Sequence, residues 1–105
     1  MRATLDQLEK TIAERRTADP SRSYVAKLTA RGRAKIAQKV GEEAVETVIS
    51  AMAGDRAGTI GESADLLFHL LLLLADLDIP FDAVLDELDR REGVSGIDEK
   101  AARTE

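Results

Sequence analysis

Residues 66–74 read LLFHLLLLL and form the most apolar stretch of this 105-residue chain. As a helix, the stretch is apolar on every side, so other helices must cover it all round. A membrane span needs about 20 consecutive apolar residues, roughly twice what this segment offers. The segment therefore predicts a buried core helix, and no membrane is expected as a partner.

The composition around this segment favours an all-α domain. Aromatic residues make up 3% of the chain and there are two prolines, which is atypical of a β-sandwich or barrel. Alanine, leucine, glutamate and the basic residues, by contrast, have high helix propensity. A chain of 105 residues has room for one domain. We expect this domain to occupy residues 1–92, with residues 93–105 as a C-terminal tail.

Charge and residue usage exclude several classes of function. The formal net charge of −5 offers no basic surface for nucleic acid, which is therefore not expected as a partner. With no cysteine and one histidine, the chain has no disulfide or thiolate zinc site, and a Ser-His-Asp triad is improbable. Residues 1–10 lack the apolar core of a secretory signal, so we expect a cytoplasmic protein. The remaining polar chemistry is that of carboxylates and amines.

Local start and stop signals predict two helices before residue 32. Thr4 followed by Gln7 is typical of a capping box, and this first helix should end before the Asp-Pro pair at 19–20. Ser23 is a good N-cap for a short helix over 24–31, which Gly32 would close.

Three further helices follow. Apolar residues at spacings of three and four predict helices over 33–53 and 59–77, joined by a connection from Gly54 to Gly58. Pro80 predicts the first position of a last helix. We expect Met52, Phe68 and Phe81 to lie in the core.

The apolar segment also predicts a partner subunit. Four other modest helices of a short chain can hardly surround residues 66–74. We therefore expect a helical bundle in which two long antiparallel helices per chain contribute to a four-helix core shared by a homodimer, or by a higher homo-oligomer.

Acidic residues lie in two pairs on the two long helices. Glu43 and Glu46 are three residues apart, as are Glu62 and Asp65, so each pair shares one helix face. At about 1.5 Å per residue the two pairs lie at similar distances from the connection, roughly 12 Å and 10 Å away. In antiparallel neighbours the four carboxylates would converge.

Such convergence is unfavourable unless something compensates the charge, because neighbouring carboxylates raise one another's pKa. A divalent cation provides that compensation. Oxygen ligands alone favour Mg²⁺, or Mn²⁺, over zinc, and Mg²⁺ completes its coordination with water and phosphate oxygens. The four acids therefore predict a metal site, with room for more than one ion, that accepts a phosphorylated substrate.

Amines precede the acids on the same helix. Lys35 and Lys39 lead to Glu43 in steps of four residues, and Lys27 continues the spacing on the preceding segment, as does Arg31. A stripe of cations that runs into an acidic cluster is suited to a polyphosphate bound through metal.

Each of these features also has a simpler explanation. Glu and Lys at four-residue steps are common on solvated helix surfaces. Glu62 completes a capping box with Thr59, whereas Asp65 directly precedes the buried leucines, where an unpaired carboxylate is costly. His69 is either a core-edge residue bonded to Asp65 or part of the substrate site. Gly41 inside a helix suggests close approach of a backbone or ligand.

These motifs resemble a known family. The pattern Glu42-Glu43-x-x-Glu46, followed after fifteen residues by Glu62-x-x-Asp65, resembles the signature of the all-α nucleoside triphosphate pyrophosphatases, the MazG-like superfamily. More specifically, residues 4–102 are similar to the phosphoribosyl-ATP pyrophosphatases in the segments SYVAKL (23–28), KIAQKVGEEAVE (35–46), ADLLFHLL (64–71) and SGIDEKA (95–101).

The resemblance implies a reaction. It is the Mg²⁺-dependent hydrolysis of the α–β anhydride of 1-(5-phosphoribosyl)-ATP to 1-(5-phosphoribosyl)-AMP and pyrophosphate, the second step of histidine biosynthesis. A water held by a carboxylate or metal attacks in line while the metal offsets the charge of the leaving pyrophosphate.

The resemblance also implies roles for particular residues. Metal ligation is carried to Glu43, Glu46, Glu62 and Asp65. The catalytic candidates are Glu42 and Glu46; Glu42 could be a ligand, a neighbour of the ligands or the base. We expect phosphate contacts from Lys35 and Lys39, and position near the motif makes Ser23, Tyr24 and Lys27 further substrate-binding candidates.

Two other functions stay open at this point. One is a housecleaning pyrophosphatase of the same superfamily that acts on ordinary or modified nucleoside triphosphates; the context of residues 23–24 and 35–41 favours the phosphoribosyl substrate. The other is a non-catalytic helical dimerisation module whose acids serve solubility.

Overall fold

The computed structural model describes residues 2–93, 96–97 and 100. Within residues 2–93 the chain forms no strand and five helices: α1 (Arg2–Arg15), α2 (Tyr24–Arg31), α3 (Arg33–Met52), α4 (Arg56–Asp76) and α5 (Phe81–Arg90). The all-α prediction is thus confirmed. Most of the tail expected at 93–105, and most of the similar segment at 95–101, lies outside the described residues, and the boundary at 92 stays a prediction.

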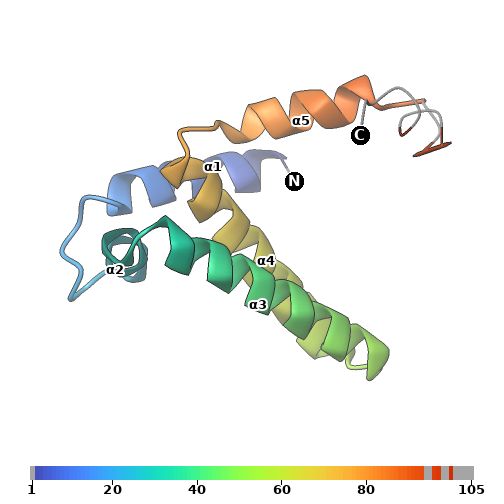
Figure 1. The fold of residues 1–105 in the computed structure, drawn as a ribbon, viewed down its shortest axis with the longest axis horizontal. Helices are drawn as coiled ribbons and strands as arrows, with labels where there is room; N and C mark the ends of the chain where they lie inside the picture. The colour runs from blue at the N-terminus through green and yellow to red at the C-terminus, as the bar shows by residue number, and fades with distance from the viewer. Residues whose placement is uncertain (1, 94–95, 98–99, 101–105) are drawn as a thin grey trace.

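The long helices α3 and α4 form an antiparallel pair, which is the main packing unit of the chain (Figure 1). The short helix α2 packs against α3, and α1 lies across the C-terminal end of α4 and also contacts α2. Helix α5 is tied back to α1, because the backbone N–H of Phe81 donates to Glu9 Oε2 at 2.8 Å. The two long antiparallel helices expected for each chain are present.

The predicted signals at helix α2 are confirmed. The Ser23 hydroxyl oxygen accepts from the backbone N–H of Ala26 at 3.2 Å and caps the helix. Gly32 ends it with a φ of +98°, which glycine adopts without a steric cost. The capping box at Thr4 was wrong, since α1 begins at Arg2 and places Thr4 inside the helix.

The start of α4 differs from the prediction. Asp55 is the N-cap, and its carboxylate accepts from the N–H of Gly58 at 2.9 Å, so the helix begins at Arg56 rather than near residue 59. Thr59 lies in the first turns and its hydroxyl donates to the Asp55 carbonyl at 2.7 Å. The capping box between Thr59 and Glu62 is therefore wrong, and Glu62 is available for another role. Pro80 precedes α5 as its N-cap residue instead of occupying its first position.

The core lies where α1, α2 and the start of α3 meet the C-terminal half of α4. Its buried apolar residues are Ile12, Val25, Ala26, Leu28, Ile36, Leu71, Leu72 and Phe81. Phe81 is in the core as predicted, and Phe68 is partly buried against it. Met52 is 83% exposed near the end of α3, so its placement in the core of the single chain was wrong.

The apolar segment of α4 is covered on one side only. His69, Leu71 and Leu72 are buried, whereas Leu67 is 43% exposed. By length and composition α4 could cross a membrane, but a core helix of a soluble protein passes the same test, so this is weak evidence. The chain by itself does not surround this helix, as the sequence indicated.

Asp76 anchors the C-terminal end of α4 to two other parts of the fold. Its carboxylate accepts from Arg33 Nε at 2.7 Å and from Arg16 Nη2 at 3.4 Å. Arg16 also donates to the carbonyl of Ala75 at 3.1 Å, and Arg33 to that of Asp76 at 3.0 Å. Cations at a helix C-terminus are further favoured by the helix dipole.

Substitution of Asp76 tests this anchor. Asp76→Ala should lower the free energy of unfolding by about 1–2 kcal/mol, because the part-buried Arg16 loses a charged partner while Arg33 is largely solvated. Urea denaturation measures the change. Glu14→Ala on the exposed face of α1 is the control, and equal stability of the two variants would contradict the anchor.

Candidate active site

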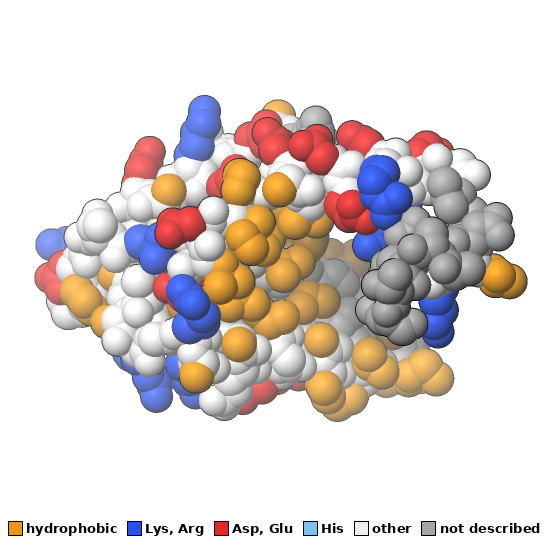
Figure 2. All heavy atoms as spheres, turned by 45° about the horizontal axis from the view of Figure 1, so that its top comes forward, with side chains coloured by type: hydrophobic (Ala, Val, Ile, Leu, Met, Phe, Trp, Pro, Cys, Tyr) orange, Lys and Arg blue, Asp and Glu red, His pale blue; other side chains and the backbone are white. Residues whose placement is uncertain are grey.

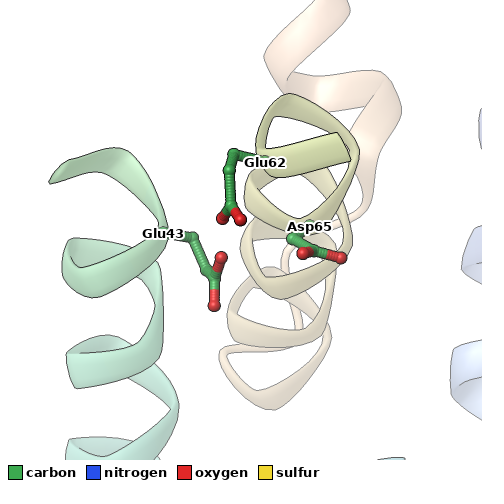
Figure 3. A group of neighbouring side chains, drawn as sticks. All are labelled: Glu43, Glu62 and Asp65. Atoms are coloured by element: carbon green, nitrogen blue, oxygen red, sulfur yellow. The ribbon is translucent and has the colours of Figure 1, made fainter. Parts of the chain in front are cut away.

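Three carboxylates from the two long helices meet between them. Glu43 of α3 and Glu62 and Asp65 of α4 each have an oxygen within 4.8 Å of those of the other two. Figure 3 shows Glu43 and Glu62 pointing toward one another across the gap between the helices, with Asp65 one turn along α4. Glu43 is 7% exposed, which is unusual for a glutamate. The structure thus brings together three of the four acids expected to converge.

The fourth acid, Glu46, lies beside the same cluster although it is exposed on α3. The carboxyl groups of Glu46 first and Glu43 second favour the protonated form of Glu62, and these neighbours together with burial raise the pKa of Glu62 to about 7. This is the mutual perturbation expected of carboxylates that share a small volume. Glu46 therefore adds negative charge to the cluster from its exposed side.

Two oxygens of the cluster are unsatisfied. Glu43 Oε2 and Glu62 Oε2 are both buried without a hydrogen-bond partner. Buried carboxylate oxygens that lack donors are costly, and either a proton or a cation removes that cost. An all-oxygen set of this kind fits a hard divalent cation such as Mg²⁺ or Mn²⁺.

Lys39 links the cluster to its surroundings. Its ammonium lies 3.2 Å from Glu42 Oε1 and 3.6 Å from Glu43 Oε1. Glu42 is exposed and also accepts from Gln38 at 2.9 Å; these bonds hold its pKa below the usual range. Glu42 is therefore held by Gln38 and Lys39 and does not join the group formed by Glu43, Glu62 and Asp65.

His69 is buried behind Asp65 and has both ring nitrogens engaged. Nδ1 lies 2.7 Å from the backbone oxygen of Asp65, and Nε2 lies 2.8 Å from the hydroxyl of Tyr24. His69 also contacts the rings of Tyr24 and Phe68 edge-on. The core-edge interpretation of His69 describes this geometry, with the bond made to the backbone of Asp65. Through His69, helix α2 is tied to the helix that carries Glu62 and Asp65.

A cationic cleft lies next to the acids. It has a volume of about 230 Å³ and is lined by Tyr24, Lys27, Leu28, Arg31, Lys35 and Lys39. Four of the residues proposed from the sequence as substrate contacts, Tyr24, Lys27, Lys35 and Lys39, thus share one cleft. The fifth, Ser23, lies at the N-cap of α2 and lines a neighbouring hollow together with Tyr24 and Lys27.

Arg31 and Gly41 lie in surroundings that differ from those expected from the sequence. Arg31 lines the cleft although it is not among the substrate-binding candidates; its four-residue step from Lys27 is the sequence signal that points to this position. At Gly41 a Cβ would meet nothing within 4 Å, so the close approach of a backbone expected there is not made by the residues that the structure describes.

The fold and the cluster define the class: an all-α protein whose paired long helices present carboxylates suited to a divalent cation. Residues 5–92 match the family model described as Phosphoribosyl-ATP pyrophosphohydrolase. The chain belongs to this family, which confirms the resemblance noted in the sequence.

Relatives cover nearly the whole chain. It is 72% identical to the phosphoribosyl-ATP pyrophosphatase of Rhizorhabdus wittichii over 98% of this chain and 97% of that protein. The proteins of the same name from Novosphingobium aromaticivorans and Azospirillum brasilense are 67% and 59% identical, over 95% and 96% of this chain and 94% and 91% of theirs.

The raised pKa of Glu62 predicts how stability depends on pH. Because its pKa is higher in the folded than in the unfolded chain, its contribution to folding is full at low pH and is lost as the pH rises through about 7. With metal removed by chelator, Glu62→Gln should therefore raise the thermal midpoint at pH 8, where it relieves repulsion, and have little effect at pH 5. Thermal unfolding by circular dichroism measures both.

Glu87 provides a matched control for that experiment. Arg90 and Arg91 lower the pKa of its carboxyl to about 2, so Glu87 is stabilised when ionised. Glu87→Gln should leave the midpoint at pH 8 unchanged or lower it. A Glu62→Gln midpoint equal to that of the wild type at both pH values would refute the repulsion within the cluster.

Proposed function

We propose that this protein hydrolyses 1-(5-phosphoribosyl)-ATP to 1-(5-phosphoribosyl)-AMP and pyrophosphate, as part of histidine biosynthesis in the cytoplasm. The observation that carries the proposal is the meeting of Glu43, Glu62 and Asp65 between α3 and α4 in a chain of this family. An adjacent cationic cleft supplies the second requirement, which is a place for phosphate groups.

The metal is Mg²⁺ in this proposal, with Mn²⁺ as a substitute. Glu43, Glu62 and Asp65 would hold it, and Glu46 would complete the set from the exposed side. When bound, such a cation supplies positive charge to phosphate oxygens and lowers the pKa of water. The two orphaned oxygens of Glu43 and Glu62 support this assignment, because they have no other partner.

Glu46 is the better of the two catalytic candidates. Its carboxylate lies at the exposed edge of the cluster beside Glu62, where it could orient an attacking water and accept its proton. Glu42 is occupied with Gln38 and Lys39, so we assign it a positioning role toward that lysine.

Lys39 contacts the polyphosphate in this mechanism. It lines the cleft and also reaches Glu43, so its ammonium lies between the acids and the remaining cations. Pairing with Glu42 raises its pKa, which keeps it charged. A fixed cation at this position would offset negative charge as pyrophosphate leaves.

Pyrophosphate release separates this proposal from the alternatives. The purified protein with Mg²⁺ should turn over 1-(5-phosphoribosyl)-ATP in preference to ordinary and modified nucleoside triphosphates. A preference for the other triphosphates would favour the housecleaning activity, and no turnover with any of them would favour the non-catalytic module.

Two variants test the acids directly. Glu46→Gln and Asp65→Asn should each lower Mg²⁺-dependent turnover more than about 100-fold, since even residues that only orient metal ligands contribute 10- to 100-fold. Helical content by circular dichroism should be unchanged. Asp82→Asn on α5 is the control, and wild-type rates in either site variant would remove that residue from the mechanism.

A homodimer is the second part of the proposal. Large apolar side chains are exposed on the outer faces of α3 and α4: Val45, Val48, Ile49, Met52, Ile60 and Leu67. A groove of about 620 Å³ runs beside Val45 and Ile49, and its other lining residues are Gly41 and the polar Gln38, Glu42 and Glu46. Figure 2 shows a different face, turned so that the side of the molecule with α1 and α5 comes forward, and there too hydrophobic side chains gather in a hollow. Contiguous apolar surface of this kind is typical of subunit interfaces.

Light scattering tests the homodimer. The wild type should be dimeric or larger at micromolar concentration, and Ile49→Glu should shift it toward monomer because a charge cannot be buried at an apolar interface without a partner. Gln7→Glu, at an exposed polar position on α1, should leave the oligomer intact. A stable, folded wild-type monomer would contradict the proposal.

A further inference from the structure

We propose that the cationic cleft binds the phosphate monoester at the far end of the substrate, with Arg31 as the specificity-determining contact. This inference rests on the proposed function, because it assigns one part of that substrate to one part of the site. The substrate carries two phosphorylated ends, a triphosphate and the 5-phosphate of the added ribose. Only the second end distinguishes it from an ordinary nucleoside triphosphate.

The cations that line the cleft outnumber the carboxylates that contact them, so the cleft is suited to an anionic ligand. Lys27, Arg31, Lys35 and Lys39 line it in a chain of net charge −5. Lys39 is paired with Glu42 and Glu43, whereas among the ion pairs of the described residues the other three cations have no carboxylate within 4.0 Å. The three cations that no carboxylate contacts repel one another, and a phosphate dianion would relieve that repulsion.

The two ends of the cleft have different neighbours. At one end, Lys39 contacts Glu43 of the acidic cluster. Toward the other, Arg31 ends α2 about 10 Å of helix rise from Tyr24, whose hydroxyl contacts the His69 ring behind Asp65. On α3, Lys35 precedes Glu43 by about 12 Å of rise. The three directly linked phosphates of a triphosphate span well under that distance. A triphosphate placed for cleavage at the acids would therefore leave the Arg31 end of the cleft free.

The chemistry at that free end fits a phosphate monoester. Arg31 offers a planar, always charged guanidinium that can donate two parallel hydrogen bonds to phosphate oxygens, and Lys27 one turn earlier on α2 adds a second charge. Tyr24 and Leu28 provide the less polar walls on the same helix. They can flank the ribose that carries the phosphate.

The Tyr24 wall is fixed relative to the acids. The Tyr24 hydroxyl lies 2.8 Å from Nε2 of the buried His69. The imidazole ring of His69 in turn contacts the backbone oxygen of Asp65 through Nδ1. The cleft and the cluster are thus held at one separation by a hydrogen-bonded link between α2 and α4. A fixed separation between cleft and cluster favours a substrate whose two phosphorylated ends are spaced to reach both of them.

Binding of the product isolates this contact from the polyphosphate. 1-(5-Phosphoribosyl)-AMP and AMP differ only in the phosphoribosyl group, and neither carries the pyrophosphate. By calorimetry the wild type should bind the former at least about 10-fold more tightly, and Arg31→Gln should weaken that binding about 10-fold or more, as expected when a charged hydrogen-bond pair is lost. Arg31→Lys should recover part of the loss, and Lys10→Gln on the exposed face of α1 is the control.

Kinetics provide the second readout. Arg31→Gln should raise KM for 1-(5-phosphoribosyl)-ATP about 10-fold with a much smaller change in kcat, because the contact is remote from the reacting phosphorus. Unchanged affinity of Arg31→Gln for 1-(5-phosphoribosyl)-AMP would overturn the inference, whatever the kinetics. A wild type that binds this product but releases no pyrophosphate from the substrate would instead refute the proposed function and leave the cleft assignment standing.

Discussion

Repulsion between carboxylates held by two antiparallel helices is the constraint on which the rest of this structure depends. Glu43 is buried, Glu62 faces it, and Asp65 lies one turn further along α4. A charge cluster of this kind destabilises a fold unless a proton or a cation neutralises it, and the pKa of Glu62 near 7 expresses that tension. The same repulsion would favour the binding of a divalent cation between these carboxylates. The proposed function requires these carboxylates, and their repulsion lowers the free energy of unfolding of the chain.

The scaffold separates opposite charges while keeping them adjacent. Acids occupy the space between α3 and α4, and cations occupy the cleft between α2 and the start of α3. Lys39 lines the cleft and also contacts Glu43 of the acidic cluster. The contact between Tyr24 and His69 joins α2 to α4, the helix that carries Glu62 and Asp65. Such a site suits a nucleotide with phosphate groups at both ends. A polyphosphate that binds through a metal needs carboxylates nearby, whereas a phosphate that binds directly to side chains needs cations.

The second constraint on the fold is the apolar face of the long helices that the chain leaves uncovered. Only one side of the leucine segment of α4 is buried within the chain, and the outer face of α3 carries exposed residues such as Val48 and Met52. A chain of this size has too little surface to cover such a helix from all directions. Oligomerisation would bury these residues, and the proposed homodimer would then complete the core that the single chain leaves open.

Local signals in the sequence were enough for the five helices and for the bounds of α2, because caps, glycines and helical spacing act over a few residues. The family followed instead from the resemblance of whole motifs to those of known proteins, which the family model confirms. The i,i+3 pairs also predicted which acids share a face. The Asp55 cap of α4 and the pair of Glu42 with Lys39 each span only three residues, but the sequence offered other local partners for these side chains. Only the tertiary structure decided that Glu43 is buried beside Glu62 and that Tyr24 meets His69 from 45 residues away. These outcomes depend on the register between packed helices, which arises from contacts that no local pattern encodes.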